Sequence, residues 1–370
     1  MYPVSKAWAE ANERFLAPEG FVELSCYIPE LDETLVYTKS DLMGFTHQQT
    51  GCLVAGELPK NYIEFSLDNS SGKWNPNSPR GLERYLSERL RITLRYGFDT
   101  HGDGRVEWIP GGVFYLSEWH TSFDGLEASF VARDLLEYMI DVPYTGAITG
   151  TLYDIASNAI AEAGIPDDAV VDLDPILMDY VVIIEDYDGV KSVAEVLQRC
   201  ANAGGCVMYQ DREGVLHVRK SWRENPEYTI PLSLSYSYPK IELLKPLRSV
   251  SVTYGDNEVY DHPYQDTGEI QTVDNEFIQT KNQAQDVAAW VADALKLRKK
   301  ISGSFRGDLC IDLFDTVRIE NKYGTVSGAT ITDIKYTFTG AFRAEYVGYV
   351  RGALMTDYIY CGDVFTGEVN

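Results

Sequence analysis

The stretch GFDTHGDGRVEWIPGGVFYLSEW, residues 97–119, gathers acidic residues and glycines between two apolar segments. A helix-flanked calcium loop would need oxygen ligands at its first, third and fifth positions, a glycine at the sixth and a bidentate glutamate at the twelfth. Counted from Asp99 to the glycine Gly104, the third position is His101, and the twelfth is Pro110, so the ligand set is incomplete. Asp-Gly between alternating apolar runs is a hairpin signal. The stretch therefore predicts two antiparallel strands joined by a turn, without a metal.

The composition favours a large globular protein rich in extended structure. At 370 residues the chain is longer than one typical core supports, which predicts two or three domains. Hydrophobic residues make up 45% and charged residues 24%, as in ordinary globular proteins. The 25 tyrosines raise the aromatic share to 12%. Because tyrosine prefers strands and half-buried contact surfaces, the composition favours β-structure that packs against a partner.

The charge balance argues against a protein that holds nucleic acid. The chain has 32 basic and 56 acidic residues, which gives a net charge of −24. Nucleic-acid binding gains affinity when Lys and Arg replace the counterions of the phosphates. The longest basic run is RKK at 298–300. We therefore expect DNA to pass along this protein without specific binding.

Neither a membrane-spanning segment nor a disulfide framework is predicted. No stretch reaches the roughly 20 apolar residues that cross a bilayer. The N-terminal MYPVSKAWAEANERFL is amphipathic and includes acids, unlike a signal or transit peptide. The cysteines are scattered without a C-x-x-C pair, so we expect free, mostly buried thiols and synthesis in a reducing cytoplasm. The six are Cys26, Cys52, Cys200, Cys206, Cys310 and Cys361.

Residues 1–133 predict a first, mostly antiparallel β domain. A short helix is expected over residues 5–16, with Ser5 as its N-cap. Short alternating strands follow between residues 21 and 67, and then a loop rich in Asn, Ser, Gly and Pro. With the strands of the opening stretch, the segment predicts a small barrel or sandwich.

Residues 134–245 predict an α+β insertion. The segments TLYDIASNAIAEAGI and SVAEVLQRCANAGG have apolar residues at helical spacing, and Gly164 and Gly204 are their predicted stops. The segment CVMYQDREGVLHVRK then predicts a hairpin that turns at residues 212–214.

Residues 246–370 predict a second β domain with one internal helix. The segments LRSVSVTYG, GATITDIKYTFTG and EYVGYV have the pattern of strands. The apolar stripe of NQAQDVAAWVADALKLRKKIS predicts a helix over about 281–301, with basic residues at its C-terminal end. The predicted fold class is thus mainly β with an α+β insertion, in which two related β domains flank a helix-containing domain.

Catalytic signatures are absent from the sequence. There is no G-x-S-x-G, H-E-x-x-H, P-loop or G-x-G-x-x-G motif. No histidine has another histidine three or four residues away, so each is expected to be solvated or hydrogen-bonded rather than a metal ligand. The five are His47, His101, His120, His217 and His262. We predict no catalytic, cofactor-binding or metal-binding residues.

An acidic pair leaves an enzyme open as an alternative. In IIEDYDG, Glu185 with Asp186 or Asp188 could serve as the two carboxylates of a cell-wall polysaccharide hydrolase. A strand end that runs into an Asp-Gly turn explains the same residues without chemistry, and this interpretation is preferred.

A carbohydrate-binding module is the remaining alternative. Trp74, Trp108 and Trp119 could act as stacking platforms for sugar rings. Core burial is the commoner fate of large aromatic residues, so the sequence alone favours a structural role for them.

Four stretches follow one another in an order typical of one known family. The first, ELPKNYIEFSLDNSSGKWNPNSPRGLERYLSERLRITLRYG, has a strand, a loop with WNP and a closing YG. The second, EWIPGGVFYLSEWHTSFDGLEASFVARDLLEYM, has a G-x-F strand and a strand that ends in ARD. The third comprises the two helices and the hairpin of the insertion. The fourth, FRGDLCIDLFDTVRIENKYGTVSGATITDIKYTFTGAFRAEYVG after the VAAWVADAL helix, has GD turns and a Y-x-F-x-G strand. Over nearly the whole chain, this order resembles the baseplate hub and tail-tip proteins of tailed bacteriophages, which share the contractile-phage tail hub fold and include the N-terminal part of the tail-associated lysin family.

The resemblance implies a non-enzymatic structural protein without cofactors. It implies a homotrimer whose two tube-type β-barrels per chain form a six-part ring, which connects the sixfold tail tube to the threefold tip and forms the channel for genome passage into the host. The implied partners are its own copies, a tail tube or distal tail protein, a tip, spike or receptor-binding protein, and a tape-measure protein. The implied location is the tail tip or baseplate of a virion, after synthesis in the bacterial host cytoplasm. Many tail-tip proteins continue into a lysin, peptidase or receptor-binding region, and here we expect such an activity in another polypeptide.

Overall fold

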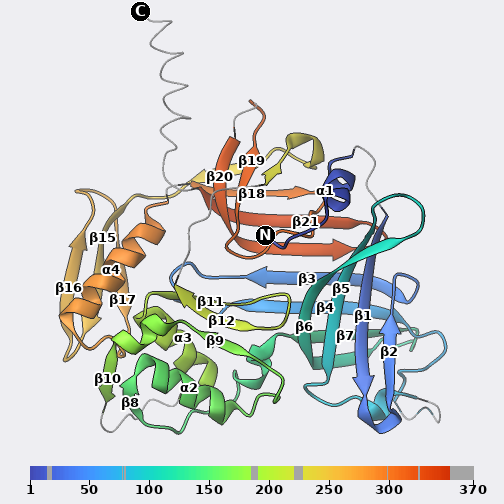
Figure 1. Cartoon of the computed structure of the whole chain (residues 1–370), viewed down its shortest axis with the longest axis horizontal. Coiled ribbons are helices and arrows are strands. Elements are labelled where there is room, and N and C mark those ends of the chain that lie inside the picture. The colour runs from blue at the N-terminus through green and yellow to red at the C-terminus, as the bar shows by residue number, and fades with distance from the viewer. Residues whose placement is uncertain are drawn as a thin grey trace, which may run out of the picture.

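The computed structural model is mainly β, with two of the four described α-helices in the middle of the chain, one near the N-terminus and one in the C-terminal part (Figure 1). This confirms the predicted fold class of a mainly β protein with a helix-containing insertion. The residues that the structure describes are 1–14, 19–76, 78, 81–184, 191–220, 228–297, 299–323 and 326–350.

One large sheet takes strands from both ends of the chain. Its strand order is β14 (Lys240–Leu243), β18 (Lys299–Phe305), β21 (Phe342–Val350), β20 (Val326–Phe338), β3 (Leu42–Thr50), β4 (Lys60–Asp68), β7 (Glu127–Arg133), β6 (Val106–Thr121), β5 (Arg91–Asp99), β1 (Gly20–Ile28) and β2 (Glu33–Tyr37). In addition, β19 (Thr316–Glu320) pairs with β20 and with the short β13 (Thr229–Ile230). Figure 1 shows β3 and β21 running across the view while β1 and β5 run steeply to them, so the sheet is strongly twisted.

The sheet is open at both ends. Among the described strands the order begins at β14 and finishes at β2, and these two strands do not pair with each other. The hydrogen bonding within this one chain therefore does not close a barrel of the predicted tube type.

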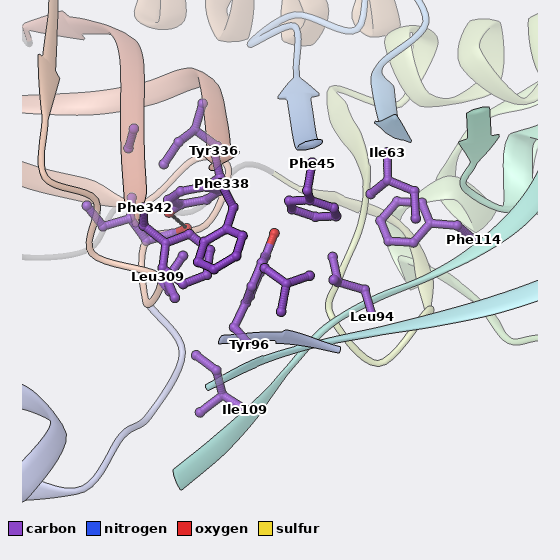
Figure 2. Close-up of a cluster of buried hydrophobic side chains, with 14 of the residues drawn as sticks. Phe45, Ile63, Leu94, Tyr96, Ile109, Phe114, Leu309, Tyr336, Phe338 and Phe342 are labelled. Carbon is purple, nitrogen blue, oxygen red and sulfur yellow. Dashed lines mark hydrogen bonds between the residues drawn. The ribbon is translucent and has the colours of Figure 1, made fainter. Parts of the chain in front are cut away.

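The two parts of the sheet meet where β3 pairs with β20. The antiparallel ladder includes Phe338 opposite Phe45. Beneath it, one hydrophobic core takes side chains from both parts. Figure 2 shows Tyr96 of β5 in this core; its ring centroid lies 6.2 Å from that of Phe45 and 5.7 Å from that of Phe342. Aromatic packing thus joins the first and last strands of the chain into one unit.

The predicted N-terminal helix is present and is shorter than expected. Helix α1 spans Lys6–Glu13, and the Ser5 side chain caps it by accepting the backbone N–H of Trp8 at 3.1 Å. Trp8 is fully buried and its ring packs 4.6 Å from that of Phe98. The cap and the buried aromatic residue fix this short helix on the large sheet.

The middle of the chain has the two predicted helices and the predicted hairpin. Helix α2 (Leu152–Ala163) ends at Gly164, whose φ of 63° is left-handed, and α3 (Val193–Ala203) ends at Gly204. Both helices begin with a capping box, which satisfies free N–H groups at the helix start and so stabilises these short helices. The hairpin strands β11 (Cys206–Gln210) and β12 (Leu216–Lys220) pair with each other, and β12 also pairs with β9 (Val171–Leu173). Strand β8 (Ile148–Thr151) pairs with β10 (Val181–Ile184).

Short 3₁₀ helices complete the described part of the chain. They are η1 (Pro29–Leu31), η2 (Glu83–Tyr85), η3 (Leu135–Tyr138), η4 (Pro175–Asp179) and η5 (Leu232–Leu234). The segment RDLLEYMID, whose apolar spacing resembles that of a helix, forms only the single turn η3.

The internal helix of the C-terminal part is shorter than the predicted 281–301. Helix α4 spans Lys281–Leu295, and the residues from Lys299 onward form strand β18. The helix stops early because the residues KKISGSF form a strand instead. Ile301 and Phe305 are buried on one face of this strand, which pairs along β21. Tertiary pairing therefore overrides the helical propensity of the lysines.

A second hydrophobic core lies beside the large sheet. Helix α4 packs on β15 (Leu247–Tyr254) and β16 (Glu258–Pro263), and β17 (Glu269–Asp274) completes their sheet. Leu152, Leu197, Val252 and Val287 all contribute to this core. Side chains on both sides of the predicted boundary near residue 245 thus share one core, and the division into 1–133, 134–245 and 246–370 stays a prediction.

Candidate functional site

The predicted turn after Asp99 is confirmed as the connection of the β5–β6 hairpin. The Asp99 carboxylate accepts the backbone N–H groups of Gly102, Asp103 and Gly104 at 2.7, 3.2 and 2.8 Å. These bonds, above all the one from Gly104, hold the pKa of Asp99 below its usual range. The carboxylate that suggested a calcium loop therefore serves the turn itself.

The acidic pair of the enzyme alternative cannot be placed. Glu185, Asp186 and Asp188 lie outside the described residues. Across the part of the chain that the structure describes, no group of three or more His, Cys, Asp or Glu side chains is arranged to hold a metal ion. No described helix is long and apolar enough to cross a membrane.

The three tryptophans do not form a set of exposed platforms. Trp74 is 4% exposed, and its ring packs 5.3 Å from that of Phe130. Trp108 is half-buried beneath the Arg95 guanidinium, 5.1 Å from the ring centroid, and Trp119 packs against the first core. The stacking role suggested for Trp74 is therefore wrong, because its faces are already used in the core.

Two histidines have hydrogen-bonded partners on both ring nitrogens, as the sequence predicts. His47 is buried and bonds to the hydroxyl of Tyr96 at 2.6 Å and to Oδ1 of Asn61 at 2.9 Å. Burial lowers its pKa to about 4, so it is neutral near pH 7. His217 lies between the carboxylates of Asp172 and Asp211, each 2.9 Å away. These contacts serve packing and ion pairing.

Strand β14 forms one free end of the large sheet and carries exposed apolar side chains. Ile241 and Leu243 on the strand, and Tyr236 and Tyr238 just before it, are 44%, 71%, 57% and 65% exposed. In the described strands, β14 pairs only with β18. The unpaired backbone groups of an edge strand can pair with another strand. Apolar side chains beside such an edge are typical of a surface that a partner covers.

A hollow of about 490 Å³ opens on the sheet face beside β14. Tyr238, Lys240, Arg343 and Glu345 are among the residues that line it. The Arg343 guanidinium also lies over the ring of Tyr236, 5.4 Å from its centroid. The hollow therefore offers aromatic, cationic and anionic contacts next to the unpaired edge.

Strand β2 forms the other free end, and its surroundings have the opposite charge. Val36 on this strand is half exposed, and the adjoining turn presents the exposed carboxylates of Glu30, Asp32 and Glu33. At the β14 end, basic side chains outnumber acidic ones in a chain that is acidic as a whole. The basic side chains are Lys240, Lys245, Lys299, Lys300 and Arg343, and the acidic ones are Glu242, Glu269 and Glu345, of which Glu242 and Glu269 pair with Lys240 and Lys245. The two free edges are thus complementary in charge.

Comparison with known proteins identifies relatives at the level of structure. No family model matches the sequence. No curated protein matches it significantly either.

Solved structures of tail proteins match nearly the whole chain. The tail protein from Neisseria meningitidis MC58 has 14% identity and a TM-score of 0.61, over 90% of this chain and 97% of that one. The 43 kDa tail protein of prophage MuSo2 from Shewanella oneidensis has 12% identity and a TM-score of 0.58, over 89% and 97%. Prophage tail protein gp18 from Listeria monocytogenes EGD-e has 12% identity and a TM-score of 0.54, over 94% and 99%.

The chain therefore has the fold of phage tail proteins, of the tail hub and baseplate type. This confirms the fold that the four sequence stretches imply. At such identities the similarity is one of architecture, and the pairs of residues that make contacts have to be found in this chain itself.

Sequence reasoning missed the residues that define the free edges. Tyr236 and Tyr238 lie in SYSYP, where alternating tyrosines before a proline could have indicated an edge strand. Nothing local in the sequence marks β2 and β14 as the ends of one sheet, since this follows from pairings across the whole chain.

Proposed function

We propose that this protein is a structural hub of a phage-type tail tip or baseplate. In this proposal three copies form a ring that connects the sixfold tail tube to the threefold tip and surrounds the channel for genome passage. The observation that carries it is the match of about nine-tenths of the chain to nearly complete tail proteins.

The free edges supply a physical route to the ring. Each copy has one β14 edge and one β2 edge, so pairing β14 of one copy with β2 of the next gives a head-to-tail contact. Such heterologous contacts close into a ring when the rotation between copies allows it. Closure buries the apolar side chains at β14 and removes both unpaired edges from solvent.

The charge of the chain supports a role as a passive channel. With a net charge of −24 per copy, the ring wall would not retain the phosphate backbone of a passing duplex. In this role the protein is non-enzymatic. The two parts of the large sheet, which meet where β3 pairs with β20, take the place of the two barrels and give a ring of three copies the six parts that match a sixfold tube. Its partners are a tail tube or distal tail protein, a tip, spike or receptor-binding protein and a tape-measure protein, and it resides in the virion tail.

Charge reversal at the two edges tests the proposed ring. We expect a solution mass of about three times the 41.6 kDa of one chain. Lys240→Glu or Glu33→Lys alone should lower this mass to that of one chain, because each places like charges across the contact. The double variant should restore it. The control is Glu10→Lys on α1, which should leave the mass unchanged.

Two results would contradict the proposal. One is a single-chain mass for the unmodified protein at its highest soluble concentration and also in reconstituted tail tips. The other is a stable ring whose mass neither single charge reversal changes. This result would be consistent with the oligomer but would show that it does not form through a β14–β2 contact.

A further inference from the structure

A second hollow, of about 500 Å³, lies where β4 begins, β7 ends and η3 begins, far from both free edges in the strand order. Apolar side chains form part of its wall, among them Leu58, Val131 and Ile140. Its charged lining is acidic on balance, with four carboxylates and two cations. The carboxylates are Glu64, Glu118, Asp134 and Glu137, and the cations are Lys60 and Arg133. We call this feature the Asp134 hollow.

Asp134 is the buried group of the hollow. Its side chain is 2% exposed, and its Oδ1 accepts the backbone N–H of Leu136 at 3.1 Å, which caps η3. Its other oxygen, Oδ2, has no hydrogen-bond partner among the described residues. A buried carboxylate oxygen without a donor is costly. The site is therefore incomplete as it stands.

The cation nearest in sequence is already engaged. Arg133 donates to Oε1 of Glu118 at 3.2 Å and to Oε2 of Glu137 at 3.4 Å. It thereby holds two of the carboxylates in place around the hollow. Asp134 and Glu64 are the two lining carboxylates that this guanidinium does not bind in the described part of the chain.

We propose that the Asp134 hollow binds the side chain of an arginine that a partner protein presents. Carboxylates at the head of the hollow suit a guanidinium, which donates several N–H groups in one plane and is weakly hydrated. The apolar wall suits the aliphatic stem that precedes such a head group. The excess of acid over base, in a chain with a charge of −24, favours a basic partner segment. This site is independent of the proposed ring, since β4 and β7 lie in the interior of the strand order.

Binding of N-butylguanidinium, compared with the neutral N-butylurea, tests the head-group chemistry on the intact protein. We expect saturable binding of the cation, and binding of the urea that is weaker by about tenfold or more. Asp134→Asn keeps the shape of the side chain and the η3 cap, and it should weaken binding of the cation by about tenfold. Glu118→Gln should weaken this binding by a smaller factor. The matched control is Asp141→Asn, an exposed acid in the following loop.

A pH series adds a readout that a purely structural role would not move. Burial raises the pKa of Asp134 to about 7, Glu137 raises it further and Arg133 lowers it. The other charged groups that line the hollow are Lys60, Glu64 and Glu118. Since the bound cation favours the ionised carboxylate, affinity should rise from about pH 6 to about pH 8 in the unmodified protein and stay flat in Asp134→Asn. Equal affinity for the cation and the urea, or unchanged cation binding by a folded Asp134→Asn protein, would overturn the proposal.

Discussion

Arg212 and Asp312, one hundred residues apart in the chain, form a largely buried ion pair, with Arg212 Nε donating to Asp312 Oδ1 at 2.5 Å. Arg212 lies in the turn of the β11–β12 hairpin, and its other nitrogens donate to the carbonyls of Pro110 at 3.3 Å and Ile311 at 3.2 Å. One guanidinium therefore ties the middle of the chain to strand β6 and to the segment before β19.

Removing the acid of this pair should be strongly destabilising. Arg212 is 6% exposed and Asp312 is 31% exposed, so Asp312→Ala leaves a buried, uncompensated cation. We expect the free energy of unfolding to fall by roughly 3 kcal/mol in denaturant titrations. The control is Asp103→Ala, whose partner Arg105 is 88% exposed and whose loss should cost well under 1 kcal/mol as an ion pair. Equal losses in the free energy of unfolding for the two variants would contradict a stabilising role for the Arg212–Asp312 ion pair.

The ion pairs of His217 should make stability depend on pH. Burial lowers the pKa of His217, but its hydrogen bonds to the carboxylates of Asp211 and Asp172, which accept them, outweigh burial and raise the pKa above 6.5. Because the folded pKa is the higher one, the stabilisation is complete below pH 6.5 and is lost as pH rises through the folded value. His217→Asn should flatten this part of the profile, measured as thermal midpoints across pH 6–9. His120→Asn, at an exposed position on β6, should leave the profile unchanged.

The turn glycine of the same hairpin should tolerate no side chain. Gly214 has a φ of 87°, and a Cβ there would lie 2.9 Å from Cβ of Val113. Gly214→Ala should cost about 3 kcal/mol, because backbone strain and a clash add up. Gly102 has a φ of 72° but open space around it, so Gly102→Ala should cost only about 1 kcal/mol. The difference between the two variants in urea unfolding measures the contact between hairpin and β6; a difference near zero would show that the contact is absent.

Asp134 should lower stability at neutral pH. Its folded pKa of about 7 exceeds the ordinary 3.8, so the folded state keeps a proton that the unfolded state releases. Stability from this group is therefore greatest below pH 3.8 and declines as pH rises to about 7; the two pKa values correspond to a loss of at most about 4 kcal/mol. Asp134→Asn should raise the free energy of unfolding at pH 8 by about 2 kcal/mol and reduce its decline with pH. A variant less stable than the original at pH 8 would refute this assignment.

Local sequence patterns predicted helices and strands well where capping or turn residues mark the ends of these elements. Ser5, Gly164 and the turn after Asp99 were all placed correctly, because caps and turns depend on a few neighbouring residues. The preferred interpretation of Trp74, burial in the core, is confirmed, although its contact with Phe130 depends on a strand far away in the chain. Helix α4 illustrates the limit of local patterns, because the pairing of Lys299 and its neighbours with β21 decides where the helix ends.

The candidate sites depend on information that is not local. The free edges follow from the order of the described strands in the sheet. Asp134, whose Oδ2 has no partner among the described residues, is surrounded by segments that are far apart in the chain. The structure shows Asp134 as the N-cap of η3, and no local pattern in the sequence indicates that it is buried. The class of fold was accessible through the order of the four stretches, whereas the contacts were not.

The pairing of β3 with β20 cannot form until late in the synthesis of the chain, because the two strands are far apart in the sequence. Thr50 is made early, and its ladder partner Asp333 follows 283 residues later. At about 5 to 20 residues per second this gap lasts on the order of 15 to 60 s, during which β3 lacks that neighbour. Until β20 emerges, one edge of β3 has no partner strand, so aggregation of the nascent chain competes with correct pairing.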